Sequence, residues 1–93
     1  MNSVKNETTI HILNDLLFNR KVDCTAIRSI EILRVNSAGK AEVKVTKKAG
    51  KIMSKLIEDV GLLLDSKHVK SYKVSHSSDM VALFDITMNN EEE

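Results

Sequence analysis

The sequence contains no proline, no tryptophan, three glycines, one cysteine and three aromatic residues. A single cysteine, Cys24, excludes an intramolecular disulfide and is too few for a cysteine-ligated structural metal site. With so few glycines, the glycine-rich loops that bind phosphates or dinucleotides are absent. Three aromatic side chains are also too few to form a platform on which nucleic-acid bases stack.

Long apolar runs and an excess of one charge are absent too. No run approaches the roughly 18 residues that a membrane span requires, and residues 1–9 lack the basic-then-apolar pattern of a signal peptide. The formal net charge of +1 gives no overall attraction to nucleic acid or anionic lipid. We therefore expect a cytoplasmic protein without a membrane partner. Eleven lysines against three arginines, with eight isoleucines and seven asparagines, suggest an AT-rich phage or bacterial genome.

The composition that remains is typical of one small globular domain. The chain has 93 residues, of which 42% are hydrophobic and 29% are charged, close to globular averages. Two independent cores would need a longer chain. The sequence predicts a single α+β domain over residues 1–88, followed by a disordered acidic tail over residues 89–93.

Two segments have the spacing of amphipathic helices. Residues 7–20 place their apolar side chains on one side of a helix, with Asn6 as the N-cap. Residues 49–65 repeat apolar side chains at i, i+3, i+4 and i+7, which predicts the main core helix. Gly61 lowers the helix propensity of this segment by about 1 kcal/mol relative to alanine, and indicates that another backbone approaches there.

The other regular segments read as strands. Residues 41–46 alternate between apolar and polar, as a half-buried strand does. Residues 27–35 are apolar on both sides, which predicts a central or doubly covered strand. Residues 69–75 and 80–88 complete a second hairpin. The predicted fold is therefore helix-hairpin-helix-hairpin (αββαββ), a four-stranded antiparallel sheet with two helices on one face.

The residues that could carry chemistry do not form a recognisable site. His11, His68 and His76 lack the spacing of metal ligands, and Cys24 has the character of an inert, partly buried thiol. The adjacent carboxylates Glu58 and Asp59 fall on the polar side of the second helix, where solvated charge is the ordinary explanation. We expect no catalytic residue, no metal, no cofactor and no small-molecule substrate, and thus no enzyme.

A run of lysines surrounds the expected start of the second helix. The positive end of a helix dipole disfavours cations, so lysines there suggest a bound anion such as a phosphate. A lysine-rich solvated face is the other explanation, and the sequence leaves both open. The residues of this candidate anion-binding site are Lys40, Lys44, Lys47, Lys48 and Lys51.

Apolar residues also occur where polar ones are expected. Phe18 and Leu62 fall on the polar sides of the two helices, and Ile30 and Ile32 belong to the strand that is apolar on both faces. Excess apolar surface of this kind is typical of protein–protein contact or self-association. These four residues are the predicted partner-binding surface of a small regulatory protein that acts as a homodimer or modulates a larger partner. The alternative is a DNA- or RNA-associated regulator that binds phosphates through the basic segment from Lys40 to Lys55.

Overall fold

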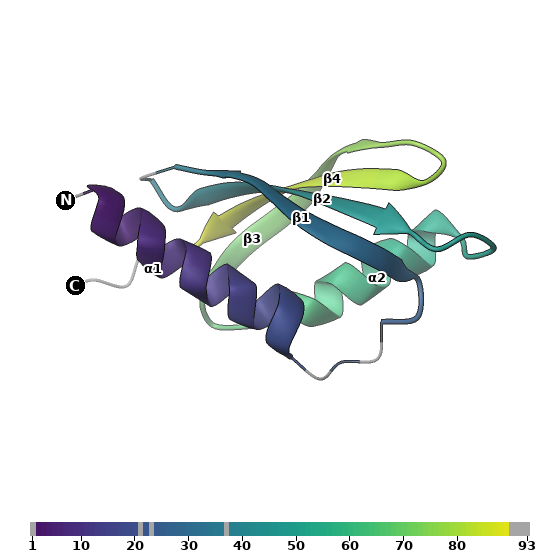
Figure 1. The fold of residues 1–93 in the computed structure, drawn as a ribbon, viewed down its shortest axis with the longest axis horizontal. Helices are drawn as coiled ribbons and strands as arrows, with labels where there is room; N and C mark the ends of the chain where they lie inside the picture. Colours follow the sequence, from purple (N-terminus) through teal and green to yellow (C-terminus); the bar gives the residue numbers. More distant parts are fainter. Residues whose placement is uncertain (1, 21, 23, 37, 90–93) are drawn as a thin grey trace.

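A computed structural model describes residues 2–20, 22, 24–36 and 38–89, with side chains from Thr8 onward. It contains a four-stranded antiparallel sheet with two helices packed against one face (Figure 1). The predicted α+β class and the antiparallel four-stranded sheet are confirmed. The elements, in chain order, are α1 (Asn2–Asn14), the short π-helix η1 (Asp15–Asn19), β1 (Ile27–Val35), β2 (Lys40–Lys47), α2 (Met53–Leu63), β3 (Val69–Ser77) and β4 (Val81–Met88).

The core lies between the helices and the two inner strands. The sheet order is β1-β2-β4-β3, so β2 and β4 are central. Every second residue of each inner strand is buried against the helices, from Ala41 to Lys47 in β2 and from Ala82 to Met88 in β4. Their other side chains are partly buried, or exposed at Lys40, and line the opposite, open face of the sheet.

The first strand differs from the prediction, because β1 is an edge strand and not a central one. Its pairing with β2 shifts register between Ile27 and Ser29 and again between Ile32 and Arg34. Such an irregularity adds a residue to one strand and resets its alternation. Ile32 and Val35 therefore both pair with buried residues of β2, although they are three positions apart. The sequence of β1 reads as apolar on both faces because of this bulge, and not because both faces of the strand are covered.

The bounds of both helices differ from the prediction. α1 begins at Asn2, so Asn6 lies within it, and the polar residues before position 7 carry no apolar spacing that would reveal helix. At the other end, η1 replaces the last α-helical turn and buries the adjacent Leu16 and Leu17. α2 begins only at Met53, because Gly50 takes a positive φ of 85° that helical residues do not adopt.

A buried carboxylate ties α2 to the beginning of β1. Asp59 is fully buried, where the sequence predicted a solvated side chain. It accepts a hydrogen bond of 3.0 Å from the Ala26 backbone N–H and an ion pair of 2.7 Å from Lys55 Nζ. Burial raises the pKa of the Asp59 carboxyl, but the bond from Lys55, the Ala26 N–H and the charges of Lys55 and Lys51 lower it by more. The net pKa lies below the ordinary 3.8.

An arginine from the other helical segment closes the end of α2. Arg20 Nη1 donates to the carbonyl oxygens of Leu63 at 2.9 Å and Asp65 at 3.0 Å. The last carbonyls of a helix have no partner inside it, and a cation complements the negative end of the helix dipole. Arg20 therefore joins the C-terminal ends of the two helical segments, which lie together in Figure 1.

Gly61 faces a side chain, not a backbone as predicted. A Cβ built at Gly61 would lie 2.6 Å from the Tyr72 hydroxyl oxygen and 3.7 Å from the ring carbon that bears it. The glycine thus lets the aromatic ring of β3 lie against α2. This contact fixes the outer strand β3 to the helix layer.

Neither helix in the described part of the chain has the length and apolar character needed to cross a bilayer. Asn89, the first residue of the predicted tail, is held by its neighbours: its N–H donates to the His68 carbonyl at 2.8 Å and its side-chain amide to the Lys67 carbonyl at 2.6 Å. The rest of the predicted tail, residues 90–93, lies outside the described residues.

The lowered pKa of Asp59 predicts a specific pH dependence. Because the folded pKa lies below the unfolded one, the charged carboxylate stabilises the fold above pH 3.8, and this contribution is lost as the pH falls through the folded value. The free energy of unfolding of Asp59→Asn should lie below that of the wild type by a constant amount above pH 5 or so, and the gap should narrow in more acidic solution. Urea melts of both proteins across this range measure the gap; a gap that does not narrow contradicts the assignment.

The Gly61–Tyr72 contact predicts a coupled pair of substitutions. In the Tyr72→Phe background the nearest ring atom lies at ordinary contact distance, so Gly61→Ala should stabilise the protein by ~0.5–1 kcal/mol through helix propensity. In the wild-type background the same change displaces the hydroxyl, so its gain should be smaller or reversed. Thermal or urea melts of the four proteins give the coupling energy. Equal effects in the two backgrounds would show that Tyr72 does not restrict residue 61.

Candidate interaction surface

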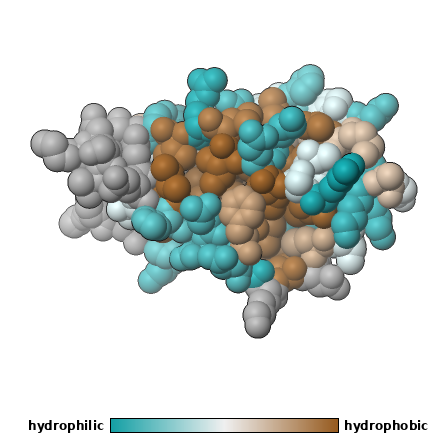
Figure 2. Space-filling model, viewed as in Figure 1, coloured by the Kyte–Doolittle hydropathy of each residue, from teal (hydrophilic) through white to brown (hydrophobic). Residues whose placement is uncertain are grey.

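The edge strand β1 carries apolar side chains that the helices leave partly uncovered. Ile30 and Ile32 pair with the fully buried Val45 and Val43, and so lie on the helix side of the sheet, but both are only half-buried. Val35 is half-buried in the same way, and Leu33, at the second irregularity, is 42% exposed. Figure 2 shows apolar surface over β1 and beside the helices. We call Ile30, Ile32, Leu33 and Val35 the β1 band.

Charged residues accompany this band at intervals of three. Arg28, Glu31 and Arg34 are all exposed, and they give β1 the charge order plus, minus, plus. On the open face Glu31 lies opposite Lys44 of β2. Arg34 Nε contacts Glu42 Oε1 at 3.1 Å, with the Arg34 side chain 79% exposed. The edge of the sheet therefore combines an apolar side with a patterned charged side.

The other two predicted partner-binding residues lie at the C-terminal ends of the helices. Phe18, in η1, is 50% exposed, and Leu62, near the end of α2, is 47% exposed. Arg20 links the two: it follows Phe18 by two positions in the chain, and its Nη1 lies 3.4 Å from the Leu62 carbonyl oxygen. The predicted surface thus forms two parts, the β1 band with Ile30 and Ile32, and a helix-end pair with Phe18 and Leu62.

The predicted anion-binding lysines do not share one surface. Lys40 and Lys44 belong to the open face of β2, whereas Lys47 is buried on the helix side. Lys47 Nζ donates to the carbonyl oxygens of Lys48 at 3.2 Å and Lys51 at 2.5 Å, so its charge holds the loop between β2 and α2. Lys48 and Lys51 are exposed in that loop. Lys55, at the end of the basic segment, holds the buried Asp59.

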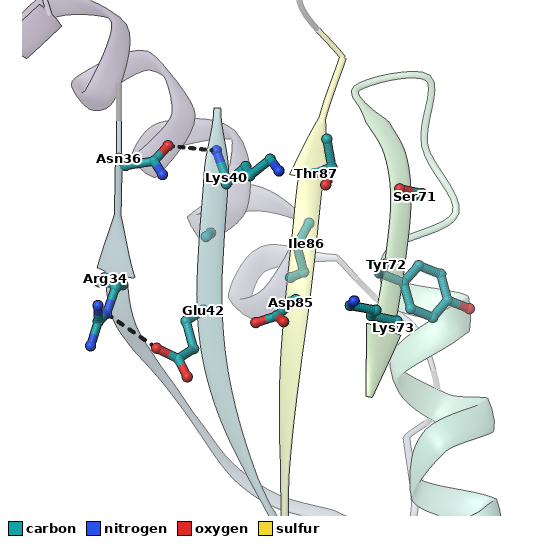
Figure 3. Close-up of a pocket in the computed structure, with 11 residues that line it drawn as sticks. Arg34, Asn36, Lys40, Glu42, Ser71, Tyr72, Lys73, Asp85, Ile86 and Thr87 are labelled. Carbon is teal, nitrogen blue, oxygen red and sulfur yellow. Dashed lines mark hydrogen bonds and ion pairs between the residues drawn. The ribbon is translucent and has the colours of Figure 1, made fainter. Parts of the chain in front are cut away.

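The open face of the sheet is hollowed near one end. Figure 3 shows the residues that line this hollow, which come from all four strands and from the turn after β1. Across its middle runs a row of four charges, because Glu42 pairs with Asp85 and Asp85 pairs with Lys73, while Arg34 contacts Glu42. Like charges directly opposite each other destabilise a sheet, and here a cation stands on either side of the two carboxylates. The two positive and two negative charges of the row therefore neutralise one another within the chain.

The three histidines and the cysteine take separate positions in the fold. His11 and His76 are exposed, and His68 is half-buried at the start of β3. Cys24 is half-buried, and its sulfur lies 3.8 Å from the Asp59 carbonyl oxygen. Among the described side chains, no three His, Cys, Asp or Glu residues come together as a metal site requires.

Three polar contacts that organise the structure were not predicted from the sequence. Lys47 could have been found, since the alternation of β2 carried two positions past Val45 places it on the apolar side. The pair of Lys55 and Asp59 has the i, i+4 spacing of a helical ion pair, but nothing local shows that Asp59 is buried. Arg20 acts on carbonyls more than 40 positions away, and no local pattern signals such a contact.

Comparisons of the chain with known protein families, with curated proteins and with solved structures found no match.

The position of Lys47 predicts that it differs from its lysine neighbours. Lys47→Gln shortens a buried side chain and leaves two loop carbonyls without a charged donor, which should cost ~1–3 kcal/mol. Lys48→Gln, at an exposed position next to it, should cost under ~0.5 kcal/mol. Urea denaturation of the two variants compares them directly. Equal stabilities of the two variants would show that Lys47 does not stabilise the loop more than an exposed lysine does.

Proposed function

We propose that this protein is a small, non-enzymatic regulatory protein that binds another protein chain through the β1 band. One observation carries the proposal. The apolar residues that the inner strands β2 and β4 present to the helices are buried, whereas those of β1 stay half-buried or exposed at the edge of the same sheet. Covering apolar side chains that the described residues leave exposed is favourable, and a partner chain can supply that cover. The cytoplasm is the proposed location, because the single cysteine requires no oxidising compartment.

The charges of the molecule support a protein partner over nucleic acid. Binding to a duplex requires several cations that reach phosphates along one surface. Two of the five candidate lysines lie on the open face, two lie in the loop before α2, and Lys47 is occupied by carbonyl groups. On the open face, Glu31, Glu42 and Asp85 stand among the cations. A regulator that binds DNA or RNA phosphates stays the second proposal, and the experiment below includes its test.

The β1 band is tested by one substitution with a matched control. Leu33→Ser removes exposed apolar area at the band, and Leu62→Ser removes a similar area at the helix-end pair. Each tagged protein is incubated with a lysate of the source cell, and the captured proteins are quantified by mass spectrometry. We expect Leu33→Ser to lose partners that the wild type and Leu62→Ser retain. Equal capture by all three proteins, or loss with Leu62→Ser only, contradicts a role for the band.

Nucleic acid is tested in parallel by fluorescence anisotropy with a labelled duplex at two salt concentrations. We expect binding no tighter than ~10⁻⁴ M at physiological salt, the weak end of electrostatic contact. Tight binding that weakens with salt and disappears when Lys40, Lys44, Lys48 and Lys51 are changed to glutamine would favour the second proposal. Lys47 stays unchanged in that variant, because its substitution would also loosen the loop.

A further inference from the structure

We infer that the chain that covers the β1 band is a second copy of this protein, related by a two-fold axis that sets the two β1 edges antiparallel. This inference rests on the proposed function and names the partner of the same surface. β1 is one end of the sheet order, so none of the described strands lies beside its outer edge. A two-fold contact brings the same surface of both copies together, so that surface must be complementary to itself.

The charges on β1 are complementary to themselves in few alignments. Where two identical strands run antiparallel, placing Glu31 opposite Glu31 of the second copy also places Arg28 opposite Arg34, and all of these contacts repel. Opposite charges face each other in two alignments only. One sets Arg28 opposite Glu31 of the second copy, and the other sets Glu31 opposite Arg34 of the second copy. Charge complementarity of this kind fixes the register of an interface more than it adds affinity.

The faces of the strand distinguish these two alignments. Directly opposite residues of an antiparallel pair point to the same side of the sheet. With Arg28 opposite Glu31, Ser29 of the open face would meet Ile30 of the helix side. With Glu31 opposite Arg34, Ile30 meets Val35, and both belong to the helix side, while the charged pair belongs to the open face. The second alignment alone satisfies both charge and face.

Arg34 can serve both its own chain and the second copy. The contact with Glu42 uses Nε, and the guanidinium carries further N–H donors on its terminal nitrogens. The exposed side chain places these donors where a second carboxylate can approach. Two such pairs form across the axis, one from each copy.

The character of the opposite edge strand explains why the contact should stop at two copies. Bulges and charged residues on an edge strand oppose unlimited strand addition. β3, the opposite edge, has register shifts at Lys70 and Ser75 and carries Lys70 and Lys73. It offers neither an apolar band nor a self-complementary charge order. A two-fold contact through β1 uses both β1 edges and leaves only β3 edges outside, so it closes as a dimer.

Two single charge reversals test the register. Copies of Glu31→Arg place two arginines opposite each other in every self-pair, and copies of Arg34→Glu place two glutamates opposite each other. Each variant alone should associate at least ~10-fold more weakly than the wild type, since juxtaposed like charges are strongly unfavourable. Mixed in equal amounts, they should form a heterodimer, because every pair across its axis joins an arginine and a glutamate. Native mass spectrometry resolves the species by their masses, and sedimentation equilibrium gives the dissociation constants.

Controls separate the contact from effects within one chain. Lys44→Gln and Glu42→Gln remove the neighbours of Glu31 and Arg34 inside the sheet, and should leave the wild-type dissociation constant within ~3-fold. Circular dichroism melts confirm that all variants fold. The wild type should approach twice 10.4 kDa as its concentration rises.

Each outcome decides a different claim. A wild type that stays at 10.4 kDa at millimolar concentration overturns the inference, as does a wild-type dimer that the mixed variants do not restore. If the wild type is monomeric but Leu33→Ser still loses captured proteins, the proposed function holds with a different partner. If Leu33→Ser changes neither capture nor self-association, the proposed function fails together with the inference.

Discussion

The carboxylate of Asp59 joins the helix layer to the sheet at the point where β1 begins. It sits in the buried face of α2, yet it bonds to the backbone N–H of Ala26, the last residue before the edge strand. An ionised group at such a depth is strongly unfavourable without partners, and here Lys55 and the Ala26 N–H supply them. This contact fixes where β1 enters the sheet relative to α2. The half-buried state of the β1 band depends on that placement.

Arg20 and Gly61 complete the attachment of the helices to each other and to the opposite edge. Arg20 closes the end of α2, and Gly61 admits the Tyr72 ring beside the same helix. The contacts of Asp59, Arg20 and Gly61 all involve α2. The first uses a buried carboxylate, the second a guanidinium that caps the helix, and the third a glycine that leaves room for a ring. α2 therefore acts as the common support of the two edge strands. The edges differ because β1 contains three isoleucines, whereas β3 has fewer apolar residues in its sequence and more lysine and serine.

The sequence allowed the class of the fold to be predicted, because period and turn composition are local properties. The alternation from Ala41 to Val45 and the helical spacing around Leu56 each depend on residues a few positions apart. The position of β1 at the edge could not be read in this way. Its apolar side chains appear on both faces only if alternation is counted without a bulge, and a bulge is visible only when the partner strand is known. The candidate site followed the same rule: Phe18 and Leu62 are exposed as their helical positions predict, whereas the inward turn of Lys47 and the burial of Asp59 depend on packing.

Edge strands must both resist unwanted pairing and, where a partner exists, accept the correct one. In β1 these requirements are met by different groups. The register shifts near Arg28 and Leu33 break the regular row of backbone donors and acceptors that any strand could use. In the proposed dimer, the charges of Glu31 and Arg34 select one antiparallel alignment, in which the apolar residues meet on the helix side. Affinity in such a contact comes from the isoleucines and valine, and selectivity comes from the charges, because exposed ion pairs contribute little energy but repel strongly when mismatched. In the proposed dimer, an edge of this composition binds one partner strand in one register and disfavours pairing with other exposed strands.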